Sequence, residues 1–559
     1  MIIFLVTLSS FAEVLSIGAV IPFVAVIMNP DKLMSLKAVS FFTDYLNIKE
    51  SDFLIFFTLF FVFVSFLSNL VRLVTLYLTL RLSYAIGSDL SSSLFRKILD
   101  FSYVQRGGLS SSEIVSTIIT KSDIVTFQTI VPIFTLISSI IMLALIGCSL
   151  LIYNPIIAIS AIIFFGLFYY VVAFFVNTKI HENSKSISLM SDVVVSKIQQ
   201  GIRGHKETIL NSLQNYYHVP FSEADYKLRK AQSFNNFIGQ CPKFVIESFG
   251  ISFIALLALY LRNNTNSSDV LSTIAILALA SQRLLPILQH GYLSWINLKS
   301  SSQIFLDVLN ILKIKTSAKR SHRNNINFNK TIQLKNINFS FRTGKIFQDV
   351  NLNIEKGDIV GIYGRSGSGK STLIDIIMCF LCPTKGEILI DKVKINPTNI
   401  NNWQSKISLV PQEIFLFNSS IKENITFESK TLGVEQEAAF LKSVALVCGK
   451  ELLARFGSNN IGEYGSKLSG GQKQRIGLAR AIYHKKEVLV IDEGTNALDK
   501  ATETIILKSI CKYAKENNIT IFFITHNKQH HNFFDTILNI TNKKITKYKK
   551  RFKNSYDYS

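Results

Sequence analysis

The clearest chemistry in the sequence lies in nine consecutive residues, Gly364-Arg365-Ser366-Gly367-Ser368-Gly369-Lys370-Ser371-Thr372. Their glycines let backbone N–H groups turn inward around an anion, and a helix that begins after them adds its N-terminal partial positive charge. Lys370 is predicted to reach the β- and γ-phosphates, and the Ser371 hydroxyl to bind Mg²⁺. An apolar strand-like run (358–363) precedes the loop and a helix-compatible run (372–380) follows it. The chain is therefore predicted to bind a nucleoside triphosphate.

Further motifs follow in the same half of the chain. A short sequence, Leu468-Ser469-Gly470-Gly471-Gln472, lies well downstream of the phosphate loop. An apolar strand (488–492) ends in two adjacent carboxylates, Asp492 and Glu493, and Asn496-Ala497-Leu498-Asp499 follow at once. Gln412 precedes these motifs, and Thr525-His526 end a later apolar strand.

In this order the motifs resemble the ATP-binding cassette (ABC) family, and the resemblance extends over the whole chain. It implies that Asp492 holds Mg²⁺ together with Ser371 and Gln412. Glu493 is the expected general base and His526 the expected donor to the γ-phosphate, with Lys370 as the third catalytic group. ATP and Mg²⁺ are the implied cofactors.

The resemblance also assigns the remaining ATP contacts. The phosphate loop is expected to contribute Gly364, Ser366, Gly367, Ser368, Gly369, Lys370, Ser371 and Thr372. The residues expected to bind ATP held by another subunit are Ser469, Gly470, Gly471 and Gln472. Asp499 is also expected to bind ATP. Phe341 is expected to stack on adenine, with core packing as the alternative. The family's usual residues are replaced by Gly494 and Asn496 without loss of a catalytic group. One cassette cannot complete an ATP site, so a homodimer is the simplest assembly, and a heterodimer stays open.

Composition separates two halves. The chain has 559 residues, 48% of them hydrophobic, with 43 Phe and a mean hydropathy of +0.30, and the apolar residues concentrate before about residue 310. The predicted domains are a transmembrane domain (1–310), a linker (311–328) and an ATP-binding domain (329–559). The net charge of +22 fits a cytoplasmic face beside anionic lipid. No nucleic-acid module is evident, so no nucleic-acid partner is expected. Six cysteines show no disulfide or metal spacing.

The N-terminal half is predicted to cross the membrane six times, at residues 2–28, 53–80, 124–153, 156–176, 244–261 and 270–288. Lys and Arg concentrate in the two long connectors, 83–123 and 177–240, which places these connectors in the cytoplasm with both chain ends. Both connectors are expected to be helical extensions. The first apolar run lacks the features of a cleavable signal peptide. The predicted fold is a membrane all-α six-helix domain of exporter type fused to an α/β phosphate-loop domain.

The membrane half also resembles lipid-linked oligosaccharide flippases of the PglK type, through residues 13–23 and 271–286. This resemblance implies a polyprenyl-pyrophosphate glycan as substrate, flipped across a bacterial inner membrane. Basic residues that could bind its pyrophosphate are Arg72, Lys243, Arg283 and His290. The alternative is that these residues pair with Glu13 and Glu247 or extend to the membrane surface. An exporter of peptides, lipids or drugs is the alternative function, and a cassette that regulates a channel is a third. Segments 102–110 and 211–217 are expected to couple the two domains.

Overall fold

The computed structural model describes residues 2–18, 53–153, 155–264, 267–315, 326–341, 344–429 and 431–549. The chain forms two compact units. One comprises Met1–Asp100 and Gly107–Ile314, and the other comprises Phe101–Arg106 and Lys315–Ser559. The short segment Phe101–Arg106 thus groups with the C-terminal unit, although it lies far from that unit in the sequence.

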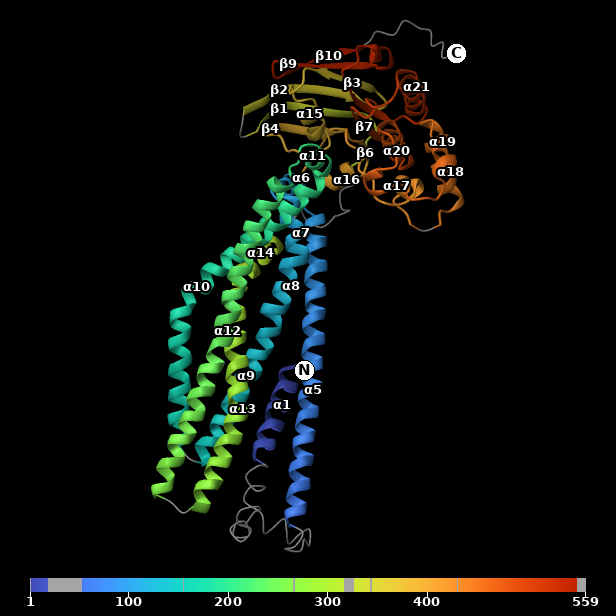
Figure 1. Cartoon of the computed structure of the whole chain (residues 1–559). Helices are drawn as coiled ribbons and strands as arrows, with labels where there is room; N and C mark the ends of the chain where they lie inside the picture. The colour runs from blue at the N-terminus through green and yellow to red at the C-terminus, as the bar shows by residue number, and fades with distance from the viewer. Residues whose placement is uncertain are drawn as a thin grey trace. The chain divides into compact units, whose positions relative to one another are not determined.

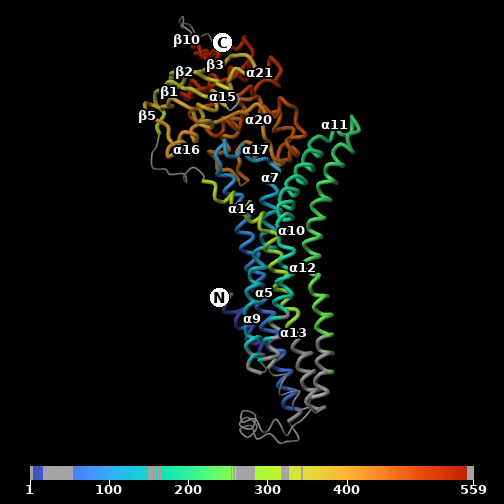
Figure 2. The backbone as a smooth tube through the Cα atoms, turned by 90° about the vertical axis from the view of Figure 1, so that its left-hand side faces the viewer, coloured from blue at the N-terminus to red at the C-terminus, as the bar shows by residue number. Residues whose placement is uncertain are grey.

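The N-terminal unit is helical (Figure 1). Its helices are α1 (Ile2–Gly18), α5 (Phe53–Leu99), α7 (Ser111–Ser116), α8 (Ser122–Val125), α9 (Val131–Tyr153), α10 (Pro155–Arg203), α11 (His205–Leu210), α12 (Gln214–Asn264), α13 (Ser267–Ser300) and α14 (Ser302–Lys313). Two π-helical segments, η2 (Thr117–Lys121) and η3 (Thr126–Ile130), interrupt the stretch between α7 and α9. The long helices α10, α12 and α13 run beside one another, and α5 runs beside α1 (Figures 1 and 2).

These helices test the predicted spans and connectors. Two helical stretches among the described residues, Ile55–Leu99 and Ser111–Cys148, are long and apolar enough to cross a membrane, and a shorter apolar helix covers Phe4–Ser16. The prediction that both long connectors are helical is confirmed, since α5 continues to Leu99 and α10 continues to Arg203. The first predicted span extends beyond Gly18 into residues 19–28, which lie outside the described part of the chain.

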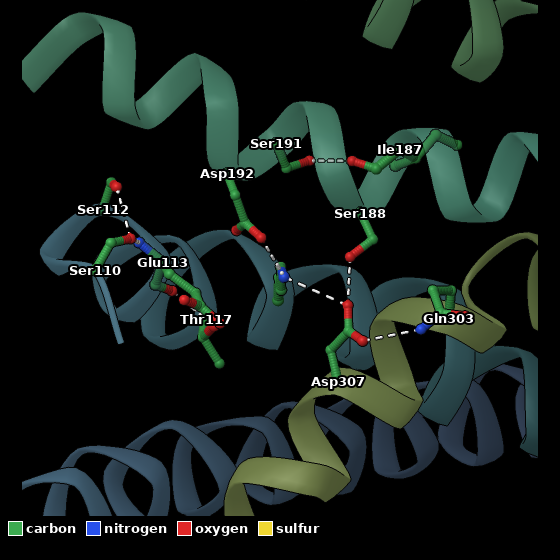
Figure 3. Close-up of polar contacts among 11 residues, drawn as sticks. Ser110, Ser112, Glu113, Thr117, Ile187, Ser188, Ser191, Asp192, Gln303 and Asp307 are labelled. Carbon is green, nitrogen blue, oxygen red and sulfur yellow. Dashed lines mark hydrogen bonds and ion pairs between the residues drawn. The ribbon is translucent and has the colours of Figure 1, made fainter. Parts of the chain in front are cut away.

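A buried polar cluster joins three elements of the helical unit (Figure 3). Lys121, at the end of η2, is 3% exposed, and its Nζ lies 2.8 Å from Asp192 Oδ2 on α10 and 3.4 Å from Asp307 Oδ2 on α14. Ser188 Oγ donates a hydrogen bond to the same oxygen of Asp307, and Gln303 Nε2 donates to its Oδ1 across 2.9 Å. A buried lysine is tolerated here because two carboxylates compensate its charge.

The C-terminal unit contains two sheets. The strands of the unit are β1 (Thr331–Phe341), β2 (Gly344–Glu355), β3 (Ile359–Gly364), β4 (Lys385–Ile390), β5 (Val393–Lys394), β6 (Ile407–Val410), β7 (Val488–Asp492), β8 (Thr520–Ile524), β9 (Thr536–Thr541) and β10 (Lys544–Lys549). The first sheet is antiparallel, in the order β2-β1-β4-β5. The second has the order β10-β9-β3-β8-β7-β6 and is parallel from β9 to β6.

The parallel sheet positions the predicted motifs, which follow its strands β3, β7 and β8. Its central strands β3, β7 and β8 are almost entirely buried, as expected for strands covered by helices on both faces. The helices of this unit include α15 (Lys370–Ile377), α20 (Gly470–Tyr483) and α21 (Lys500–Glu516). The carboxyl ends of parallel strands lie at one edge, where open α/β sheets bind ligands. The predicted α/β phosphate-loop domain is confirmed.

Candidate ATP site

The phosphate loop connects β3 to α15, as the sequence predicts. Gly367 and Gly369 have φ of +75° and +101°, which glycine adopts without strain. Lys370 is buried, and its Nζ donates hydrogen bonds to the carbonyl oxygens of Gly364 and Arg365 across 3.1 and 3.2 Å. Its ammonium group is therefore held at the loop itself. Ser368 Oγ is buried and has no hydrogen-bond partner in the described part of the chain, as expected of a group that awaits a phosphate oxygen.

Of the three residues expected to hold Mg²⁺, Ser371 and Asp492 lie near each other at the end of β7, and Gln412 donates to Glu493 instead. Ser371 lies near enough to Asp492 to favour the charged form of its carboxylate. Burial raises the pKa of Asp492, and the neighbouring charge of Glu493 raises it further. A divalent cation would relieve both effects, and hydroxyl and carboxylate oxygens are ligands that Mg²⁺ prefers. The donor set therefore fits Mg²⁺.

Three side chains converge on the carboxylate of Glu493. Gln412 Nε2 donates to its Oε2 across 3.2 Å, and Asn496 Nδ2 donates to the same oxygen across 3.0 Å. His526 Nε2 lies 3.0 Å from its Oε1. Glu493 itself has φ of +49°, a strained value for a residue with a side chain, and such strain concentrates at functional sites. This arrangement holds one carboxylate in one orientation, as a general base requires.

The motif Leu468-Ser469-Gly470-Gly471-Gln472, called the signature motif from here on, leads into α20 and contributes to the lining of a cavity, called the signature cavity. Ser469 caps the helix: its Oγ accepts from the N–H of Gln472, and Gln472 Oε1 accepts from the N–H of Ser469. A Cβ on Gly471 would lie 2.9 Å from the carbonyl oxygen of Ala497, so only glycine allows this close packing. The cavity has a volume of about 580 Å³. Its lining residues are Glu451, Leu452, Arg455, Ser469, Gly470, Gly471, Gln472, Arg475, Ala497, Leu498 and Asp499.

The lining of this cavity includes the four residues expected to bind another subunit's ATP, together with Asp499, and none of the phosphate loop 364–372, which the structure describes throughout. Asp499 caps α21 by accepting from the N–H of Thr502, and this hydrogen bond lowers the pKa of Asp499. Arg455 and Arg475 bring two guanidinium groups, which can bind phosphate, to the lining beside the carboxylates of Glu451 and Asp499. Neither arginine was predicted, because their positions beside the cavity depend on the fold.

Phe341, the predicted adenine contact, is 45% exposed and makes an edge-to-face contact with Phe339, with ring centroids 4.9 Å apart. This exposure does not fit the alternative of core packing. Adenine stacking remains a prediction.

The basic residues of the helical unit are partly paired. Arg72 Nη1 lies 3.3 Å from Glu13 Oε1, and Lys243 Nζ lies 4.0 Å from Glu247 Oε1, so both pairs of the alternative interpretation form. His290 is within electrostatic range of both Arg72 and Lys243. The side chain of Arg283 lies outside the described residues.

One of the predicted coupling segments also makes defined contacts. Tyr103, in the short helix α6 (Tyr103–Gly107), stacks on Phe380 with ring centroids 5.4 Å apart and an interplanar angle of 18°. Gln105 Nε2 donates to the carbonyl oxygen of Lys315 across 2.9 Å. Both contacts lie within the C-terminal unit as defined above. Coupling of the two domains through residues 102–110 or 211–217 remains a prediction.

Comparison with known proteins agrees with this site. Residues 347–496 match the sequence model of the ABC transporter family. A probable ABC transporter ATP-binding/permease protein of Haemophilus influenzae is 33% identical over 215 residues, 38% of this chain and 39% of the relative. The alpha-hemolysin translocation ATP-binding protein HlyB of Escherichia coli O157:H7 is 36% identical over 262 residues, 45% of this chain and 36% of the relative. The matched stretches thus span less than two fifths of either relative. The C-terminal unit is an ATP-binding domain of the ABC transporter type.

The fold of the whole chain matches a solved structure. A bacterial Atm1-family ABC exporter with ATP bound superposes with a TM-score of 0.79, covering 97% of this chain and 92% of that one at 17% sequence identity. The chain therefore has the fold of an ABC exporter subunit, with a helical N-terminal part and a C-terminal ATP-binding domain.

Proposed function

We propose that two copies of this chain form an ATP-driven exporter in a membrane, with the ATP-binding domains in the cytoplasm of a bacterial cell. The convergence of Gln412, Asn496 and His526 on Glu493 carries the hydrolytic part of this proposal. Glu493 takes a proton from the attacking water, while Lys370 stabilises the phosphate charge. Ser371 and Asp492 would hold Mg²⁺, which would supply further positive charge beside the phosphates. ATP binding closes the pair of cassettes, and hydrolysis reopens it to drive alternating access.

The signature cavity supports the dimer. It collects residues suited to bind a phosphate, yet no phosphate-loop residue of the same chain lines it. A second subunit would bring its own phosphate loop to this cavity, which makes each ATP site composite. A homodimer closes both sites with one kind of chain.

Mixed dimers test the composite site. Lys370→Ala disables the phosphate loop and Ser469→Arg blocks the signature cavity, so each variant alone is expected to lose ATP turnover. A dimer of one Lys370→Ala chain and one Ser469→Arg chain retains one intact composite site, and part of the activity is expected to return. If each site were formed within one chain, both chains would be inactive and no activity would return, which would refute the dimer model.

Glu493→Gln tests the base assignment directly. We expect turnover to fall at least about 100-fold, because a positioned general base contributes about that much, while ATP binding persists. The matched control is Glu435→Gln, which neutralises an exposed carboxylate at the start of another helix. Steady-state turnover that survives Glu493→Gln would show that another group activates the water.

The proposed substrate is a polyprenyl-pyrophosphate-linked oligosaccharide, flipped from the inner to the outer leaflet of the bacterial inner membrane. The proximity of His290 to Arg72 and Lys243 supports a site for an anionic headgroup, because basic side chains inside a membrane unit bind phosphates. Purified chain in liposomes is expected to flip a pyrophosphate-linked glycan, and Arg283→Ala is expected to reduce flipping more than basal ATP turnover. Unchanged flipping by Arg283→Ala would count against this basic site.

Export of a polypeptide is the second candidate. It is favoured by relatives named for toxin export, the HlyB protein and the leukotoxin export protein LtxB of Aggregatibacter actinomycetemcomitans, which is 37% identical over 200 residues. In the same liposomes a polypeptide substrate would stimulate ATP turnover, whereas pyrophosphate-linked lipids would have no effect.

A further inference from the structure

Four buried polar side chains follow or precede Glu493 and His526, the two residues in contact in the ATP site, by at most ten residues. They are Thr495, Glu503, Thr525 and His530, which are 2%, 8%, 3% and 5% exposed. Buried polar groups cost free energy unless they are hydrogen-bonded, so their partners carry information. The general mechanism proposed above uses none of them.

These side chains form one connected chain of contacts. Thr495 Oγ1 donates to Glu503 Oε1 across 2.6 Å. His530 Nε2 lies 3.5 Å from the other oxygen of Glu503, and His530 Nδ1 lies 3.3 Å from Thr525 Oγ1. Glu503, in the first turn of α21, is therefore placed between the loop after β7 and the loop after β8.

The contacts close a ring around the reacting groups. Thr495 follows Glu493 by two residues, and Thr525 directly precedes His526. The contact of 3.0 Å between His526 and Glu493 completes the circuit. A shift of either loop would therefore disturb both the buried contacts and the alignment of His526 with Glu493.

The hydrogen bonds also define the protonation of His530. Asn527 Oδ1 accepts from the N–H of Gln529, which directs the Asn527 amide nitrogen toward His530 Nε2, at 3.1 Å. His530 Nε2 must then be an acceptor, so the ring is neutral and its proton resides on Nδ1, from where it donates to Thr525 Oγ1. Protonation of Nε2 would set two donors, His530 and Asn527, against each other.

We infer that neutral His530 is a positioning residue for ATP hydrolysis, which holds the loop bearing His526 through Thr525 and Asn527 beside Glu503, whose carboxylate accepts from Thr495 in the segment bearing Glu493. This inference rests on the proposed ATP hydrolysis and adds a pH range within which the site is aligned. The elements around His530 contribute Glu503 from α21 as the ionisable group that acts on it, and the rings of Phe523 and Phe533.

The direction of the pH effect follows from burial. Burial lowers the pKa of His530, and the charge of Glu503 opposes this effect in part. His530 therefore stays neutral down to a pH below the ordinary histidine value of about 6.5. Below that range Nε2 gains a proton, which opposes the Asn527 amide and favours Glu503 as its partner, so the hydrogen bond from Asn527 that holds the loop bearing His526 is lost.

Rates of ATP turnover between pH 5 and 8, measured on the full chain in liposomes, test this inference. Wild type is expected to lose kcat on the acid side as His530 becomes charged. His530→Gln keeps hydrogen-bonding capacity and cannot titrate, so this acid-side loss is expected to disappear. His530→Leu is expected to lower kcat about tenfold at pH 7.5, because misaligned groups react slowly, with KM for ATP within about twofold of wild type.

Glu503→Gln removes the charge that favours protonated His530, so the acid-side loss is expected to move to lower pH. The matched control is Gln529→Ala, an exposed side chain in the same turn, which is expected to keep the wild-type profile. A purely structural role would lower the melting temperature of His530→Gln and leave its pH profile unchanged, and that result would overturn the inference. Wild type that fails to hydrolyse ATP at any pH would instead refute the proposed function.

Discussion

Asn496 donates a hydrogen bond from Nδ2 to Oε2 of Glu493 across 3.0 Å, from a position three residues further along the chain. The left-handed backbone of Glu493 and a turn closed by the Asn496 N–H to the Glu493 carbonyl, at 3.3 Å, fold the chain back on itself. The amide of asparagine therefore reaches the carboxylate that is expected to act as the base. From the sequence, Asn496 was only a departure from the family's usual residue, with no assigned role. In the structure it donates a hydrogen bond to Glu493.

Asn496→Ala is expected to lower kcat about fivefold, since a partly exposed hydrogen bond to a charged group contributes about 1 kcal/mol. Gln412 and His526 still contact Glu493, so ATP binding and KM are expected to stay near wild type. The control Asn459→Ala removes an exposed amide elsewhere in the unit. A kcat within twofold of wild type would show that the two remaining contacts are sufficient to orient the base.

The phosphate loop, the end of β7 and the end of β8 were all predictable, because each pairs an apolar strand with a short motif of constrained residue types. The side-chain contacts that join these three segments were not predictable from the sequence. His530 has no local signature: it gains its role when strands far apart in the sequence meet in one parallel sheet. Likewise, a pairing such as Lys121 with Asp307 spans 186 residues and depends on the packing of helices that charge patterns alone do not define.

The helices show the same limit. Apolar runs predicted six spans, and the two long connectors were predicted as helices from their length. The two π-helical segments, η2 and η3, could not be foreseen, because a π-bulge arises from local packing rather than from a residue pattern. The paired states of Arg72 and Lys243 were foreseen only as alternatives, since sequence does not define which face of a helix meets a partner.

Tyr103→Ala is expected to loosen the segment Phe101–Arg106. The stacked pair of Tyr103 and Phe380 contributes about 0.5–1.5 kcal/mol beyond the area it buries. Hydrogen exchange of the amides in this segment should therefore accelerate about two- to tenfold. Val104→Ala, which shortens an exposed neighbour, is the control. Unchanged exchange in Tyr103→Ala would show that other contacts, such as that of Gln105 with Lys315, hold the segment.

Asp375→Asn is expected to raise stability at neutral pH. Burial, and secondly the charge of Asp492, raise the pKa of Asp375 to about 6. Between its ordinary value of 3.8 and about 6 the folded chain retains a proton that the unfolded chain releases, so stability falls as pH rises through this window. The full pKa shift would correspond to about 3 kcal/mol in the free energy of unfolding. Because Asp375 is partly in contact with solvent, the expected difference is about 1 kcal/mol.

Melting temperatures of the full chain in detergent at pH 5 and pH 8 measure this effect. Asp375→Asn should melt at a higher temperature than wild type at pH 8, and this advantage should shrink at pH 5. Glu516→Gln, which neutralises an exposed carboxylate at the end of α21, is the control. An equal advantage at both pH values would mean that the charge of Asp375 is not the cause.

Lys121→Met is expected to destabilise the helical unit by about 2–4 kcal/mol, because it leaves Asp192 and Asp307 without their buried cation. The carboxylates are partly accessible, with side chains 26% and 27% exposed, which keeps the loss below that of a fully buried pair. Adding Asp192→Asn and Asp307→Asn to Lys121→Met removes the uncompensated charges and should restore most of the lost stability.

The measurement is thermal unfolding of the full chain in detergent, combined with hydrogen exchange in α10 and α14. Exchange should rise in both helices for Lys121→Met, because Lys121 is the cation that joins them through Asp192 and Asp307 (Figure 3). Lys185→Met, at an exposed position on α10, is the control. If Lys121→Met were no less stable than Lys185→Met, the hydrogen bonds from Ser188 and Gln303 to Asp307 would suffice to hold α14 against α10, and the buried lysine would be dispensable for the fold.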